Sequence, residues 1–403
     1  WHTIDFIKKK ISNLLFIDSN ENKNFNEIIN LIQSNRNIPT CHIEFKENEF
    51  IKLRYILIND QAVHYLVIHR KSLYVFMMKK FNSSRVPIKD NKREIEFCKQ
   101  YQSQFLTRFY GFMKENEKIT GLIYEYMSNG SLKEYLKSNH EQRNHFFSLM
   151  IISRIFQGIE YLHSNLLIHR DIKPSNILLD HDFIPYISDF PTIRHPISKE
   201  ENNDYSNDFG SDNYMSPEHY QGDFISYPCD IYSFGLVIYF VFVNKDIILN
   251  YNYYELEHDI PTIEGASNNI QSLFQSCIKY QPSERIKNDE IKRKIITEIN
   301  SISFTENDVF TNINEEQFIQ FIYDVILIEP NNLNIQTLLK INNVKLLPKF
   351  YANSGPRFTL TELIENHENY INVTNNREEW KDYFDVINIL LYKFTLSEVS
   401  NDS

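Results

Sequence analysis

A short polar segment, HRDIKPSNILLD at 169–180, contains the side chains best suited to carry out chemistry. Its carboxylate, Asp171, can orient an acceptor hydroxyl, and the amide oxygen of Asn176 can hold Mg²⁺. Phosphoryl transfer from ATP needs both groups, and the order HRDxxxxN supplies them from one loop. The apolar run ILL at 177–179 predicts a strand that fixes this loop against the core. The segment therefore predicts a phosphoryl-transfer site rather than a polar turn before a buried strand.

Four further motifs follow along the chain: ISDFP at 187–191, MSPE at 215–218, CDIYSFG at 229–235 and QPSER at 281–285. Each motif is weak on its own. In this order, however, the five segments resemble the HRDxxxxN, DFG, APE, DxWSxG and DPxxR motifs of the eukaryotic protein kinase family. The resemblance extends over residues 50–299. It implies an α+β fold of two lobes, a small β-rich lobe and a large, mainly helical lobe.

The resemblance implies a role for each polar side chain around the motif HRDxxxxN. Asp171 would orient the acceptor hydroxyl, and Asn176 and Asp189 would hold Mg²⁺. Lys173 would neutralise charge on the transferring phosphoryl group, and its position is typical of serine/threonine kinases rather than tyrosine kinases. Arg170 is a candidate for binding a phosphate on the following loop, although an acidic, solvated loop without a switch is an equal alternative.

Two structural features of the large lobe follow from the same resemblance. Glu218 and Arg285 are expected to form a buried ion pair, which is costly to break by removing one partner. The longest apolar run, residues 231–243, is too short to span a bilayer and is expected to form a buried helix.

The small lobe should supply the groups that position the phosphates. Residues 73–81, LYVFMMKKF, read as a strand that resembles the family's VAxK strand, with Lys79 as the phosphate-binding lysine. Lys80 is the alternative in the other register, because neighbouring residues of a strand face opposite sides. A helical stretch follows, in which Glu94 is the expected partner of Lys79 and Glu96 is the alternative on another face.

Residues 122–132, LIYEYMSNGSL, resemble the segment that joins the two lobes. The resemblance implies that the backbone from Glu125 to Met127 meets adenine and that Tyr124 guards the pocket behind it. Leu178, in the strand after the catalytic loop, is also expected to contact ATP.

Three departures from the family pattern predict weakened nucleotide binding. Residues 58–66 contain no glycine, whereas the family has a glycine-rich loop that brings backbone N–H groups close to phosphate. Met77 stands where the family has a small alanine above adenine, and Pro191 replaces the glycine of DFG. The alternative to a working serine/threonine kinase in intracellular signalling is therefore a pseudokinase scaffold that binds partners, with weak or no nucleotide binding.

The resemblance implies that the protein uses ATP and Mg²⁺ on protein substrates, and the composition agrees with a cytoplasmic globular protein. The net charge of −11 argues against nucleic acid or an anionic membrane as a partner. The four cysteines are scattered without metal-ligand spacing, as in proteins of a reducing compartment. We expect an N-terminal helical extension at 1–49, a kinase-like domain at 50–300 with lobes at 50–127 and 128–300, and a mainly helical appendage at 301–403. The role of the appendage is open, and partner binding is one candidate.

Overall fold

The computed structural model describes residues 43–58, 62–69, 75–82, 88–115, 118–138, 145–180, 183–196, 212–223, 225–247 and 260–301, together with Asp324. These residues fall into two compact units. The β-rich unit contains the described residues of 43–95 and 108–126, and the helical unit contains those of 96–107 and 127–301 and Asp324. The expected division into a β-rich part and a mainly helical part is confirmed. The expected helices of the N-terminal extension and of the C-terminal appendage lie outside the described residues.

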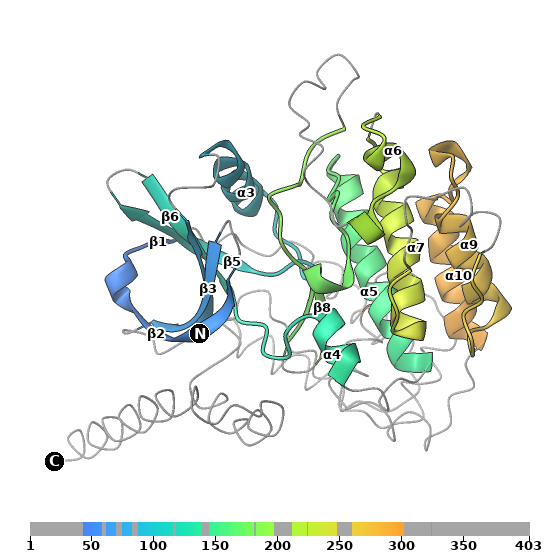
Figure 1. Ribbon diagram of the computed structural model, residues 1–403, viewed down its shortest axis with the longest axis horizontal. Helices are drawn as coiled ribbons and strands as arrows, with labels where there is room; N and C mark the ends of the chain where they lie inside the picture. The colour runs from blue at the N-terminus through green and yellow to red at the C-terminus, as the bar shows by residue number, and fades with distance from the viewer. Residues whose placement is uncertain are drawn as a thin grey trace, which may run out of the picture. The chain divides into compact units, whose positions relative to one another are not determined.

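The β-rich unit is built on a six-stranded sheet with the order β1-β5-β6-β4-β3-β2. Its strands are β1 (Ile43–Phe45), β2 (Phe50–Ile58), β3 (Ala62–His69), β4 (Val75–Phe81), β5 (Phe109–Glu115) and β6 (Lys118–Glu125). All neighbours are antiparallel except β1 and β5, which are parallel. Figure 1 shows the curl of the sheet. Helix α3 (Ile88–Gln100) follows β4.

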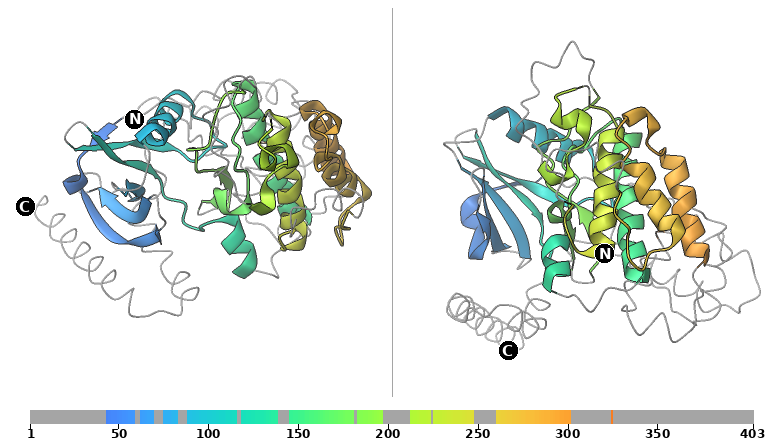
Figure 2. Two further views of the ribbon diagram at one scale, coloured as in Figure 1. Left: turned by 45° about the horizontal axis from the view of Figure 1, so that its top comes forward. Right: turned by 45° about the vertical axis from the view of Figure 1, so that its right-hand side comes forward.

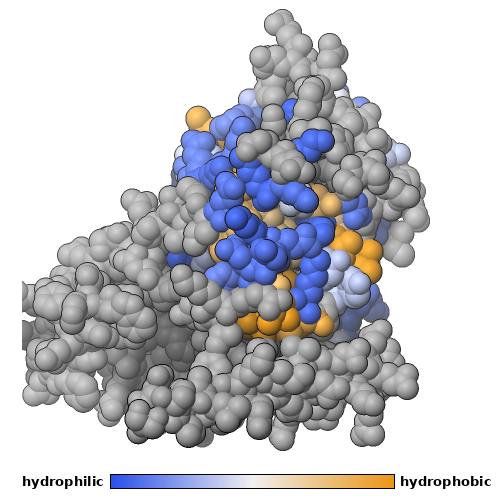
Figure 3. All heavy atoms as spheres, turned by 90° about the vertical axis from the view of Figure 1, so that its left-hand side faces the viewer, coloured by the Kyte–Doolittle hydropathy of each residue, from blue (hydrophilic) through white to orange (hydrophobic). Residues whose placement is uncertain are grey.

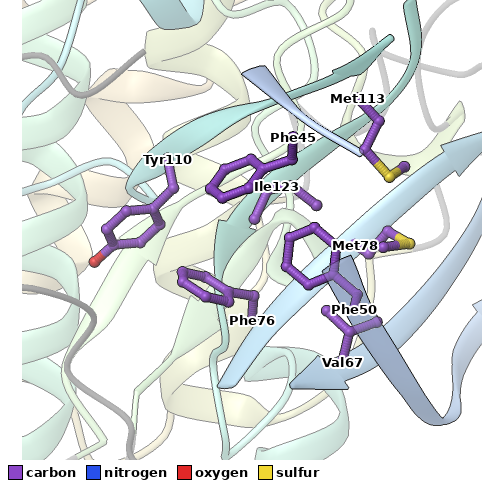
Figure 4. Close-up of a cluster of buried hydrophobic side chains, with 8 residues drawn as sticks. All are labelled: Phe45, Phe50, Val67, Phe76, Met78, Tyr110, Met113 and Ile123. Carbon is purple, nitrogen blue, oxygen red and sulfur yellow. The ribbon is translucent and has the colours of Figure 1, made fainter. Parts of the chain in front are cut away.

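The sheet begins before residue 50, because β1 and the 3-10 turn η1 (Glu47–Glu49) precede that residue. The physical reason is aromatic packing: Phe45 and Phe50 lie in one buried cluster with Phe76 and Tyr110 (Figure 4). The ring centroids of Phe45 and Phe50 are 5.2 Å apart, as are those of Phe76 and Tyr110. Such aromatic pairs contribute about 0.5–1.5 kcal/mol each beyond the burial of their area.

The same cluster determines which way β4 faces. Phe76 and Met78 both belong to it, so strand alternation directs Met77 and Lys79 to the opposite face of the sheet. On that face Lys79 is buried. The aromatic cluster on one side of the strand thus sets the position of the lysine on the other.

The helical unit is organised around α7 (Pro228–Val243), which packs against α5 (His145–Ser164) and α9 (Asn268–Cys277). Figures 1 and 2 show these helices side by side with α10 (Asn288–Ser301). The smaller elements of the unit are α4 (Leu132–Ser138), η3 (Pro174–Asn176), β7 (Ile177–Leu179), β8 (Pro185–Ile187), η5 (Asp212–Tyr214), α6 (Pro217–Tyr220) and η6 (Pro282–Glu284). The two short strands β7 and β8 pair antiparallel; the catalytic motif directly precedes β7, and Asp189 follows shortly after β8.

Helix α7 is the buried helix expected from the apolar run at 231–243, and this prediction is confirmed. Gly235 allows α9 to approach closely, because a Cβ at this position would lie 2.7 Å from Cys277 Cβ. The helix ends at Asn244, whose φ of 59° is left-handed and tolerated by asparagine. Within the described ranges, none of the helices combines the length and the apolar character that crossing a bilayer requires.

Among the coloured residues in Figure 3, hydrophilic side chains predominate, with smaller apolar areas between them. The end of the edge strand β2 is unusual among the described residues, because its residues 55–58 (YILI) are all exposed. These residues lead into the segment that the family resemblance assigns to phosphate binding, of which residues 59–61 lie outside the described part of the chain.

Candidate active site

The catalytic segment folds into a loop whose polar side chains touch one another. Lys173 Nζ lies 2.6 Å from Asp171 Oδ2, and Asn176 Nδ2 donates to the same oxygen at 2.8 Å. Asn176 Nδ2 also donates to the backbone oxygen of Asp171 at 2.9 Å. Pro174 begins the 3-10 turn η3 that brings these residues together, since its fixed φ suits the first position of a helical turn. Because both contacts use the amide nitrogen of Asn176, its oxygen is the atom suited to ligate a metal.

A buried carboxylate on α7 holds the backbone of this loop. Arg170 has a φ of 70°, a strained value for a residue with a Cβ. Asp230 compensates by accepting hydrogen bonds from the backbone N–H groups of His169 and Arg170, at 2.9 and 2.8 Å. Burial opposes ionisation of Asp230, but hydrogen bonds with His163 and with the backbone N–H of His169, together with the electrostatic effect of both imidazole rings, hold its pKa below the ordinary value. An ionised Asp230 therefore stabilises the strained turn before Asp171, a role that we did not assign from its motif.

His169 links the catalytic loop to the segment that carries Asp189. Its Nδ1 lies 3.3 Å from the N–H of Asp171, and its Nε2 lies 3.2 Å from the carbonyl oxygen of Ser188. Complete burial lowers the pKa of His169. The neutral tautomer with a proton on Nε2 satisfies both contacts, because Nδ1 then accepts and Nε2 donates.

Two hydrogen bonds hold Ser188, the residue before Asp189, to the catalytic loop. The N–H and hydroxyl of Ser188 donate to the backbone oxygen of Asn176, at 2.9 and 2.8 Å. Asp189 itself is exposed and has a φ of 66°. The next side chain, Phe190, is buried, with its ring 4.8 Å from that of Phe97 on α3 and 6.0 Å from that of His169. The chain thus directs the phenylalanine into the core and leaves the carboxylate accessible.

Asp189 and Asn176 offer the hard oxygen ligands that Mg²⁺ prefers. Among the residues that the structure describes, no three His, Cys, Asp or Glu side chains are grouped to hold a metal by themselves. That is the normal situation for Mg²⁺, which is usually bound through one or two carboxylates, water and substrate phosphates rather than an all-protein cage. The residues present fit the ion.

In the β-rich unit, Lys79 forms a buried ion pair with Glu94 of α3. Lys79 Nζ lies 2.8 Å and 2.9 Å from the two carboxylate oxygens. The hydroxyl of Tyr124, on β6, donates to Glu94 Oε1 at 2.8 Å. All three side chains are buried. Sequence reasoning proposed that Tyr124 guards a pocket and missed this hydrogen bond, because the register between β6 and α3 appears only in the fold.

The two alternatives to this pair are occupied elsewhere or exposed. Lys80 Nζ contacts both carboxylate oxygens of Glu47, at 2.6 and 2.8 Å, on the other side of β4. Glu96 is exposed on α3. Glu47 also contacts Lys52, and the two lysines hold its pKa low in spite of the opposing effect of burial. The structure therefore selects Lys79 and Glu94 as the buried pair.

Of the residues expected near adenine, Met127 and Leu178 lie in the helical unit and Glu125 lies in the β-rich unit. Met127 lies in a buried cluster with Ile184 and Tyr186, and Leu178 packs against this cluster from β7. The structure thus brings Met127 and Leu178 together within the helical unit. Glu125, in the β-rich unit, ends β6, is buried, and donates its backbone N–H to the carbonyl oxygen of Arg108 at 2.9 Å.

Glu218 and Arg285 are joined across 67 positions of sequence by two hydrogen bonds of 2.6 and 2.7 Å between the guanidinium and the carboxylate. The guanidinium also donates to the carbonyl oxygens of Pro228, Lys279 and Tyr280. It lies 4.9 Å from the ring centre of Tyr232 on α7. This arrangement ties α6, the start of α7 and the segment after α9 together.

A protein family model and several known proteins are similar to this chain. A family model of the protein kinase domain matches residues 60–296. A probable LIM domain-containing serine/threonine-protein kinase of Dictyostelium discoideum is 32% identical over 192 residues, which are 46% of this chain and 20% of the relative. A probable leucine-rich repeat receptor-like protein kinase of Arabidopsis thaliana is 36% identical over 177 residues (41% and 19%). An LRR receptor-like serine/threonine-protein kinase of the same plant is 31% identical over 192 residues (46% and 21%). The chain spans about a fifth of the length of these relatives.

Proposed function

Because the chain belongs to the protein kinase family, we propose that it transfers the γ-phosphate of ATP to serine or threonine hydroxyls of protein substrates. The observation that carries this proposal is the catalytic loop. Asp171 is contacted by both Lys173 and Asn176, and Asp189 is held to the same loop through Ser188. A loop without catalytic use has no need of this set of charged and amide groups at contact distance.

Each side chain of the loop has a definite task in this reaction. Asp171 accepts a hydrogen bond from the substrate hydroxyl and orients its oxygen toward the phosphorus. Lys173 places a positive charge beside the oxygen atoms that become more negative during transfer. Asn176 Oδ1 and the Asp189 carboxylate would hold Mg²⁺, which when bound neutralises charge on the phosphates of ATP.

Lys79 and Glu94 supply the second part of the machinery. Glu94 fixes the direction of the Lys79 ammonium group through two contacts, so that the lysine is preorganised to bind phosphate oxygens. The choice of serine or threonine rather than tyrosine rests on Lys173 and on the relatives, two of which carry serine/threonine kinase names.

The pseudokinase alternative rests on the absence of glycine from residues 58–66 and on the bulk of Met77, which is half-buried on the Lys79 face of β4. Titration of the full chain with ATP, with and without Mg²⁺, separates the two functions. The proposal expects binding that Mg²⁺ strengthens in the parent, and loss of the Mg²⁺ effect in Asp189→Asn. A parent that binds no ATP under either condition would establish the pseudokinase instead.

A further inference from the structure

Arg154, on α5, is a buried arginine that the proposed chemistry does not use. Only 2% of its surface is exposed. Its Nε donates to the carbonyl oxygen of Pro185 at 3.0 Å, and one terminal nitrogen donates to the carbonyl oxygen of Gln104. The other terminal nitrogen lies 2.7 Å from Asp324 Oδ1. One side chain therefore connects α5 with β8, with the segment after α3, and with a residue far along the chain.

Two aromatic rings fix the plane of this guanidinium. Its central carbon lies 5.1 Å from the ring centre of Phe105 and 5.0 Å from that of Tyr186. Arginine stacks on aromatic faces and offers its N–H groups in a rigid fork, so few orientations of Arg154 satisfy all of these contacts. Arg154 thus acts as a rigid connector rather than as a flexible surface charge.

The elements that Arg154 connects lead directly to Asp189. Within β8, the N–H of Ile187 donates to the carbonyl oxygen of Phe105 at 2.9 Å, and the N–H of Thr107 donates to that of Ile187 at 2.8 Å. Arg154 contacts the residue before Phe105 and the first residue of this strand. The backbone that carries Asp189 is therefore attached to α5 through Arg154.

A guanidinium buried to this degree is costly unless a carboxylate neutralises it. Asp324 supplies one, and it is itself only 1% exposed. This residue lies beyond the end of the kinase-domain match at 296 and beyond α10, which ends at Ser301. A residue of the C-terminal region, to which the sequence assigned no chemistry, is part of the buried core beside the Mg²⁺-binding segment.

We propose that Asp324 is a positioning residue: by pairing with Arg154 it keeps β8, and with it Asp189, in the arrangement that binds Mg²⁺. Loss of the carboxylate removes the charge partner that Asp324 supplies to the buried Arg154. The guanidinium then turns toward water and releases the carbonyl oxygens of Gln104 and Pro185. Asp324 is in this way a working part of the catalytic unit, a conclusion that rests on the proposed function for its effect on Mg²⁺.

The test uses four full-length chains: the parent, Asp324→Leu, Arg154→Met and the double variant, which removes both charges. Amide hydrogen exchange is measured under native conditions at the N–H groups of Ile187 and Thr107, because these report on β8 without any need for activity. In Asp324→Leu we expect exchange at these amides to be at least about tenfold faster, with α9 unchanged. Because Asp324 acts through Arg154, exchange in the double variant should be within about threefold of that in Arg154→Met, so the two substitutions are not additive.

The control is Lys292→Ala. Lys292, on α10, forms a partly exposed ion pair with Glu160, which lies on the same helix as Arg154, α5. Such pairs contribute little, so exchange at Ile187 should not change. Unchanged exchange in Asp324→Leu, or an equal acceleration in α9 and β8, would overturn the proposal. So would exchange in the double variant that is more than about threefold faster than in Arg154→Met.

A second readout separates positioning from mere stability. At a temperature at which all four chains are folded, Asp324→Leu should need at least about fivefold more Mg²⁺ for half-maximal ATP binding, and the double variant should need about as much as Arg154→Met. An unchanged Mg²⁺ requirement in Asp324→Leu would refute the positioning role. If the parent binds no ATP, the proposed function fails, and the hydrogen-exchange pattern still decides whether Asp324 holds β8.

Discussion

Replacing Arg285 by alanine should destabilise the helical unit severely. The side chain makes five hydrogen bonds, two of them to the Glu218 carboxylate at 2.6 and 2.7 Å. Both residues are buried, so Arg285→Ala leaves a carboxylate without its partner and three carbonyl oxygens without this donor. Removing one member of such a pair costs about 3–5 kcal/mol of unfolding free energy. For a unit of this size that corresponds to a melting temperature lower by roughly 6–20 °C.

Urea unfolding of the full chain, followed by circular dichroism, measures this loss. Arg293→Ala is the matched control, because Arg293 is an exposed arginine of α10 that is 3.7 Å from Glu290, and its loss should cost less than about 0.5 kcal/mol. The double variant Arg285→Met/Glu218→Leu should be more stable than Arg285→Ala, since it buries no lone charge. Equal stability of Arg285→Ala and the parent, or strictly additive effects in the double variant, would refute the reasoning.

Three further changes have definite expected outcomes. Tyr124→Phe removes the hydrogen bond to Glu94 and should lower the unfolding free energy by about 1.5–3 kcal/mol in urea, whereas an unchanged value would show that the hydroxyl is dispensable. Met77→Ala should tighten ATP binding about 5- to 150-fold by calorimetry if its bulk fills the adenine site, and equal affinities would count against that. Burial and the neighbouring Arg170 lower the pKa of His219 to about 4, below the value of about 6.5 in the unfolded chain. The unfolding free energy should therefore fall by up to about 3 kcal/mol as the pH drops from about 6.5 to 4. In His219→Gln this dependence on pH should be weaker. An equally steep dependence in the variant would show that His219 is not its source.

The contacts that sequence reasoning anticipated are those between motifs with a fixed order. Lys79 and Glu94, and Glu218 and Arg285, belong to such motifs, and in each pair the two residues are chemically complementary. The resemblance therefore identifies both partners from the sequence alone. The structure adds the distances and the burial of these pairs.

Other contacts carry no signal in the sequence. Arg154 and Asp324 are 170 positions apart and lie in no motif, so nothing links them until Asp324 meets α5 in the fold. The three-residue strand β1 becomes recognisable only through its parallel pairing with β5. Arg170, considered for phosphate binding, lies with a terminal nitrogen 3.4 Å from His219 Nε2, a contact that depends on how α6 packs. In each case the deciding information is tertiary.

The central claim is that Asp171 directs transfer of the γ-phosphate of ATP to a protein hydroxyl. The most direct measurement compares the full-length parent and Asp171→Asn for Mg²⁺-dependent transfer of labelled γ-phosphate to a generic serine/threonine substrate, with ATP binding measured in parallel. The account predicts transfer by the parent, a loss of roughly 10²–10⁴-fold in the variant, and similar ATP affinity in both, because Asp171 orients the acceptor and does not hold the nucleotide. Undiminished transfer by Asp171→Asn would contradict it.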